Sequence, residues 1–251
     1  MVKFTNRIVG MVLIALFVFS AAADETAGLH DKLSQVLKAH VKDGVVDYDG
    51  IKNDQRFFQY LDELASTNPD EFATDQEKLA YWINAYNALA IKGIIDDLSP
   101  SSFFGRISFF KTTDYQAGAR VIDLYDLERD VIIPFGEPRI HFAIVCASLS
   151  CPKLISEAYV ASRLDDQLHN SAVDFVNDPA KNQFETDRKA AKLSKIFDWF
   201  ESDFKKHSGS VQKYVSQYLK DAKLAEELDS YSVKYLKYDW NLNGTYTGSQ
   251  Q

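Results

Sequence analysis

The feature of this sequence that most restricts its fold is a long apolar segment between Thr74 and Asp96. Leu79, Trp82 and Ile83 begin a series of apolar side chains at helical spacing, and this series predicts a helix buried at the centre of the protein. Thr74 and Glu77 have the spacing of a capping box at the start of such a helix, which we expect to stop before Ser99–Pro100. A helix this apolar has to be covered by the other elements, so the rest of the chain must pack around it.

The remaining periodicities predict more helices and a few short strands. We expect helices over 27–41, 53–65, 125–132 and 161–176, with further helical segments between 195 and 228. Strands are expected within the turn–strand–turn of 43–50, around 109–110 and 121–124, over 139–147, and at the start of the C-terminal segment 231–251. The strand over 139–147 has the continuous apolar run of a strand buried on both faces. Together these elements predict an α+β fold in which several helices pack around a small mixed β-sheet, as a single domain over 24–251.

The N-terminus has the pattern of a secretory signal peptide over residues 1–23. Lys3 and Arg7 precede an apolar run from Ile8 to Phe19, and small residues follow before Asp24. We therefore expect an exported protein, periplasmic or secreted. No later stretch is apolar enough to predict a membrane span once this segment is removed.

The net charge of the chain and the absence of known binding motifs restrict which ligands it is expected to bind. The chain has 36 acidic and 28 basic residues, a formal net charge of −8, which argues against nucleic acid as a partner. There is no glycine-rich phosphate loop, no G-x-S-x-G and no HExxH, and the two cysteines lack a zinc-binding spacing. We predict neither a cofactor nor a bound metal, and expect an unidentified small molecule or peptide as ligand.

Both cysteines, Cys146 and Cys151, lie in the segment "RIHFAIVCASLSCPKL" together with His141. Three interpretations of Cys151 remain open: a nucleophile, a disulfide partner of Cys146, or an inert thiol. His141 is either the base that activates Cys151 or a core histidine. In the catalytic interpretation, Glu128 or Asp123 would orient the imidazole.

The central helix also carries polar groups that need partners. Asn84 and Asn87 would be costly to bury without hydrogen bonds, so they either anchor a neighbouring loop or, with Tyr86 between them, form a wall that contacts substrate. Trp240 is expected to cover the same site.

Four motifs taken together, "YWINAYNA", "RIHFAIVCASLSCP", "KIFDWFESDF" and "YDWNLN", resemble the family known as domain of unknown function 547. The resemblance extends from about Val46 to Asn243 and implies no particular reaction. By analogy alone, a buried helix beside a histidine on a strand is similar to papain-like and transglutaminase-like enzymes, although Asn84 stands where their thiol would be.

Two functions of different classes follow. The first is a cysteine-dependent hydrolase or acyl transferase that uses Cys151 and His141. The alternative is a non-catalytic binding or structural module in which a Cys146–Cys151 disulfide fixes a loop beside an aromatic groove. A redox-active dithiol is a third interpretation.

Overall fold

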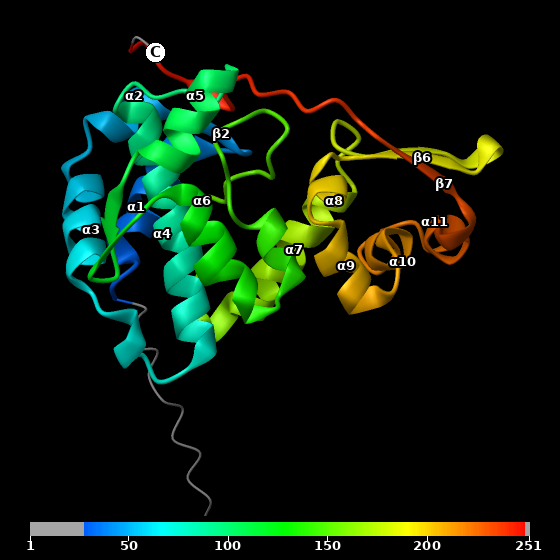
Figure 1. The fold of residues 1–251 in the computed structure, drawn as a ribbon, viewed down its shortest axis with the longest axis horizontal. Helices are drawn as coiled ribbons and strands as arrows, with labels where there is room; N and C mark the ends of the chain where they lie inside the picture. The colour runs from blue at the N-terminus through cyan, green and yellow to red at the C-terminus, as the bar shows by residue number, and fades with distance from the viewer. Residues whose placement is uncertain (1–27, 249–251) are drawn as a thin grey trace, which may run out of the picture.

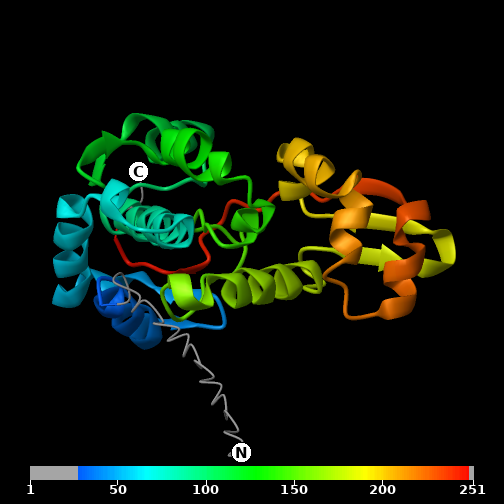
Figure 2. The same cartoon turned by 90° about the horizontal axis from the view of Figure 1, so that it is seen from below.

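The computed structural model describes residues 28–248, so the predicted signal peptide lies outside the described residues. The described chain forms two lobes connected by helix α7 and by the returning C-terminal segment (Figures 1 and 2). The first lobe contains α1 (Asp31–His40), β1 (Val41–Lys42), β2 (Val45–Asp47), α2 (Tyr48–Lys52), α3 (Gln55–Ser66), α4 (Asp75–Ile95), α5 (Phe103–Ile107), β3 (Tyr115–Ala117), β4 (Arg120–Ile122) and α6 (Leu124–Asp126). The rest of the chain contributes α7 (Leu164–Val176), β5 (Gln183–Glu185), β6 (Ala190–Leu193), α8 (Ile196–Trp199), α9 (Glu201–Ser208), α10 (Val211–Ser216), α11 (Ala222–Glu227), β7 (Ser232–Tyr235) and β8 (Gly244–Thr245). The α+β prediction is confirmed.

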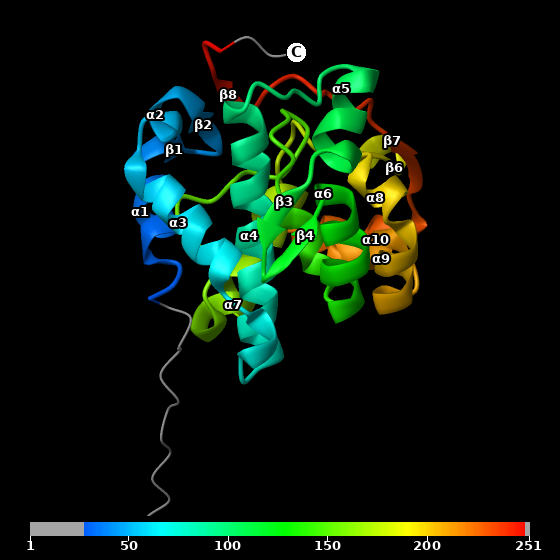
Figure 3. The same ribbon diagram turned by 60° about the vertical axis from the view of Figure 1, so that its left-hand side comes forward.

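Helix α4 is the predicted central helix. Thr74 and Glu77 form the expected capping box, and the helix ends at its cap residue Asp96. Nearly every side chain from Leu79 to Ile95 is buried, because other elements of the first lobe surround the helix (Figure 3). This burial explains why apolar residues occupy most of its circumference rather than one stripe.

The strands form three small sheets rather than one. β1, β2 and β8 make the first, β3 and β4 pair as an antiparallel hairpin, and β5, β6 and β7 make the third. In the first sheet β8 lies parallel to β2, with Gly244 opposite Val46. The chain therefore leaves the second lobe after β7 and returns to the first lobe (Figure 1).

Two hydrophobic cores meet along α7. Leu164 and Leu168 of its first half belong to the core around α4, whereas Ala172 and Phe175 belong to the core of the second lobe. Phe142 is fully buried in that second core, where its ring lies 4.9 Å from the ring of Phe175, centroid to centroid. The two lobes thus share one helix, and a pocket can form where their surfaces face each other.

The predicted strand over 139–147 is wrong. Residues Pro138–Phe142 form a 3₁₀ helix, and the chain then continues without regular structure. The run is apolar because it lies buried between the two cores, and its backbone groups find partners without a neighbouring strand. The side chain of Asn87 donates to the carbonyl oxygen of Ala143 at 2.9 Å and accepts from the N–H of Val145 at 2.8 Å.

The aromatic pair Phe109–Phe110 is also not a strand. It lies in a π-helical turn over Ser108–Thr112, which continues α5. The strand expected within 43–50 is present as β2, and the helix expected over 161–176 is present as α7. The helix expected over 125–132 is the short α6 followed by a π-helical turn over Leu127–Ile132. Within residues 28–248, no helix has both the length and the apolar character needed to cross a membrane.

Candidate functional site

A pocket of about 360 Å³ opens between the two lobes. Its size falls within the range of small-molecule sites. The first lobe contributes α5, the adjoining π-helical turns and Tyr86 of α4, and the second contributes α8. The lining residues are Tyr86, Phe103, Arg106, Ile107, Phe110, Lys111, Tyr125, Glu128, Arg129, His141, Ile144, Cys146, Cys151, Pro152, Ile196, Trp199, Phe200, Tyr238 and Trp240.

The pocket has a buried floor and an exposed aromatic rim. Tyr86, His141, Ile144 and Cys151 are each less than one tenth exposed. At the rim, by contrast, Phe103 is 64% exposed and Trp199 is 41% exposed. Apolar side chains left open to solvent around a concave site are typical of a ligand-binding surface.

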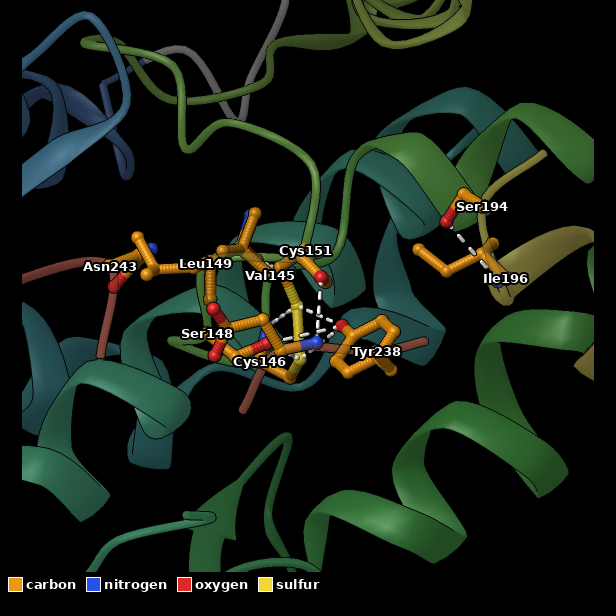
Figure 4. Close-up of a disulfide and its surroundings, with 12 residues drawn as sticks. Val145, Cys146, Ser148, Leu149, Cys151, Ser194, Ile196, Tyr238 and Asn243 are labelled. Atoms are coloured by element: carbon orange, nitrogen blue, oxygen red, sulfur yellow. Dashed lines mark hydrogen bonds between the residues drawn. A yellow bond between two sulfur atoms is a disulfide. The ribbon is translucent and has the colours of Figure 1, made fainter. Parts of the chain in front are cut away.

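Cys146 and Cys151 form a disulfide (Figure 4). Both residues line the pocket, so the bridge is part of its wall. Tyr238 lies beside it and donates a hydrogen bond to the Cys151 sulfur at 3.1 Å. The backbone N–H of Cys146 is the second donor to that sulfur, at 3.0 Å. Ser148 in turn donates to the Tyr238 hydroxyl at 3.1 Å. The disulfide interpretation of the two cysteines is therefore the one that the structure shows.

The loop between the cysteines is also held by the C-terminal segment. The N–H of Leu149 donates to the carbonyl of Asn241 at 2.7 Å, and the N–H of Asn243 donates to the carbonyl of Ala147 at 3.1 Å. Backbone pairing and the Asn87 amide thus fix this wall in addition to the sulfur–sulfur bond.

His141 has a carboxylate partner, but it is not one of the two that we expected. Its Nε2 lies 2.9 Å from Oδ2 of Asp203 in α9. The imidazole stacks on Phe200 with ring centroids 3.9 Å apart, and burial lowers the pKa of His141. The hydrogen bond from His141 holds the pKa of Asp203 below its ordinary value. An ionised Asp203 only accepts, so Nε2 carries the proton and the buried Nδ1 has no hydrogen-bond partner among the described residues.

Glu128 and Tyr86 bring two further polar groups to the pocket. Burial raises the pKa of Glu128 from 4.5 to about 7. Burial likewise raises the pKa of Tyr86, so its phenol remains an O–H donor at neutral pH. Between residues 28 and 248, neither side chain makes a hydrogen bond or an ion pair, which leaves both available to a ligand. Unpaired polar groups in a largely apolar pocket are the features that fix a ligand's orientation.

Three cations surround the mouth, each held against an aromatic ring. Lys111 lies 4.0 Å from the centroid of Tyr125, Arg106 lies 4.9 Å from that of Trp240, and Arg129 lies 5.0 Å from that of Phe200. Over the described part of the chain, none of the three forms an ion pair with a carboxylate, although many other lysines and arginines do. In an acidic protein, such a cluster leaves a local positive charge at the pocket mouth.

The pocket collects most of the residues that the sequence singled out. Glu128, His141, Cys146, Cys151, Tyr86 and Trp240 all line it. Asp123 does not: its side chain caps α6 by accepting from the N–H of Asp126 at 2.7 Å. Asn84 and Asn87 also lie outside the lining, and their contacts support the loop-anchoring alternative. Asn84 pairs with both backbone groups of Tyr159, at 2.7 and 2.9 Å.

Sequence reasoning missed Asp203, Tyr238 and the three cations. Asp203 and Tyr238 lie in or beside motifs that carry the family resemblance, "KIFDWFESDF" and "YDWNLN", but nothing in their local spacing points to His141 or to the cysteines. Asp203 reaches His141 because α9 packs against Pro138–Phe142, and Tyr238 reaches the bridge because the C-terminal segment pairs with the cysteine loop.

Comparison with known proteins supports the resemblance and supplies no activity. Residues 70–176 match the model of a family described as "Protein of unknown function, DUF547", which confirms the resemblance over that segment. This segment includes α4 and the cysteine loop. No curated protein and no solved structure matches the chain.

Proposed function

We propose that this protein is a binding module whose pocket takes a small amphipathic anion. The apolar body of the ligand lies on the floor formed by Tyr86, Ile144 and the disulfide, and its anionic group lies at the mouth. The observation that carries this proposal is the set of cations around a largely apolar pocket, Arg106, Lys111 and Arg129, which form no ion pair within residues 28–248. Hydrogen bonds to charged groups contribute about 1.5–3 kcal/mol each, so these cations favour an anion strongly over a neutral analogue.

The closed disulfide favours binding over the thiol chemistry that we also considered. While Cys146 and Cys151 are bonded to each other, Cys151 has no thiolate with which to attack a substrate. A Cys151–His141 nucleophile stays a prediction for a reduced form of the chain. With the disulfide closed, Asp203 rather than Glu128 or Asp123 is the carboxylate in contact with the imidazole.

The test is a titration with three amphiphiles that share one chain length and differ in charge. Decanoate, decanol and decyltrimethylammonium would be added while the fluorescence of Trp199 and Trp240 is followed. We expect decanoate to bind at least about tenfold more tightly than decanol, and the cation most weakly. Equal affinity for all three, or no saturable change, would contradict an anion site.

Binding should also depend on pH through Glu128. Its pKa of about 7 means that the carboxyl is neutral below that pH and negatively charged above it. A charged Glu128 repels an anionic ligand, so decanoate affinity should fall roughly fivefold between pH 6 and pH 8. Glu128→Gln keeps the size and removes the titration, so its affinity should stay level over this range. An unchanged slope in the variant would assign the pH dependence to another group.

A further inference from the structure

The bridge in the pocket wall has the surroundings of a reactive disulfide rather than of a purely structural one. Cys146 is only partly buried and faces the pocket, whereas Cys151 is 4% exposed. An external thiolate therefore reaches Cys146 more readily, and Cys151 becomes the leaving sulfur. In thiol–disulfide exchange, the reaction is faster when the leaving thiolate is stabilised.

The leaving sulfur has two hydrogen-bond donors in place. The N–H of Cys146 lies 3.0 Å from the Cys151 sulfur, and the Tyr238 hydroxyl lies 3.1 Å from it. Ser148 donates to the Tyr238 oxygen, which leaves the Tyr238 hydrogen for the bridge, where the hydroxyl lies 3.1 Å from the Cys151 sulfur and 3.2 Å from the Cys146 sulfur. Hydrogen bonds to a charged form lower the free energy of that form, so this arrangement favours a thiolate at Cys151.

The loop can keep its shape when the bridge opens. Only four residues lie between the two cysteines in sequence, so the bridge restricts the unfolded chain less than a long-range bridge would. The backbone pairs to Asn241 and Asp239 hold the same loop, with the N–H of Ser150 donating to the carbonyl of Asp239 at 3.1 Å. A cysteine pair that cycles between disulfide and dithiol needs a folded protein in both redox states. These backbone hydrogen bonds hold the loop whether or not the sulfur–sulfur bond is present.

We propose that Cys146–Cys151 is a thiol–disulfide exchange site that oxidises a partner dithiol. One thiolate of the partner attacks the Cys146 sulfur, the sulfur–sulfur bond breaks, and its electron pair goes to Cys151, which leaves as a thiolate. The second thiol of the partner then attacks the mixed disulfide and releases Cys146. The partner loses two electrons and two protons and becomes a disulfide, and the protein gains two thiols. This activity is independent of the anion binding proposed above.

The first test measures the Cys151 thiol directly. In a Cys146→Ser variant, the rate of alkylation by iodoacetamide as a function of pH reports the pKa of Cys151. We expect a value clearly below the ordinary 8.5 of a cysteine thiol. Adding Tyr238→Phe to this variant should raise the pKa of Cys151. Adding Tyr235→Phe instead, on strand β7 and away from the bridge, should leave that pKa unchanged. A pKa at or above 8.5 in Cys146→Ser would overturn the proposal.

The second test measures exchange in the wild-type chain. The protein would be equilibrated with mixtures of reduced and oxidised dithiothreitol, and its thiols counted by alkylation and intact mass. The proposal requires the bridge to open while the far-ultraviolet circular dichroism is unchanged. In a time course after addition of reduced dithiothreitol, the bridge should open more slowly in Tyr238→Phe than in the wild type. Opening that occurs only with unfolding would show a structural bridge and contradict the proposal.

Discussion

Asn87→Ala is expected to lower the free energy of unfolding by about 2–5 kcal/mol, although Asn87 touches neither the cysteines nor the ligand pocket. Its amide satisfies the carbonyl of Ala143 and the N–H of Val145, and both backbone groups are buried. Each unsatisfied group costs about 1–3 kcal/mol. Urea unfolding followed by circular dichroism measures the change.

Asn53→Ala is the matched control. Asn53 is exposed at the end of α2, where its side chain donates to the carbonyl of Asp49 at 2.8 Å. Because water can replace that partner, we expect a change within about 0.5 kcal/mol. Similar losses in the two variants would mean that the buried amide does not hold the segment before Cys146.

The helices could be predicted from the sequence because their signals are local. The capping box of Thr74 and Glu77 and the apolar spacing of α4 act within one segment, and the structure has both. The segment 139–147 could not be assigned in this way. A continuous apolar run indicates that a segment is buried, but not which groups its backbone hydrogen-bonds to. For the carbonyl of Ala143, that group is the side chain of Asn87, 56 residues earlier. The sequence showed that Asn87 needed partners, yet not which ones.

The candidate site was predicted in part for the same reason. Glu128, His141 and the cysteines could be selected by residue type and clustering, and the structure places all of them around one pocket. Asp203 lies 62 residues from His141, and Tyr238 lies 87 residues from Cys151. Their contacts depend on how the second lobe folds back on the first, which no local pattern encodes. Asp123 looked like a third member of a triad, but its oxygen is used to cap α6.

The cations at the pocket mouth are the basis of the proposed function, so their removal should have the largest effect on binding. Arg129→Gln combined with Lys111→Gln keeps a polar, unbranched side chain at each position and removes two positive charges. We expect decanoate affinity to fall at least about tenfold, because each lost charged hydrogen bond is worth about 1.5–3 kcal/mol. Decanol, which has no charge to pair, should bind as it does to the wild type.

Lys52→Gln is the control for loss of charge alone. Lys52 also lies over an aromatic ring, 5.1 Å from the centroid of Tyr246, but it is not part of the pocket lining. Decanoate affinity should be unchanged in this variant.

The measurement that tests the central claim most directly is therefore the dissociation constant of decanoate and of decanol, in the wild type and in the Arg129→Gln/Lys111→Gln variant, by isothermal titration calorimetry. An anion-binding pocket predicts a selective loss of decanoate binding with decanol unaffected. An equal loss for both ligands, or no loss for either, would contradict it.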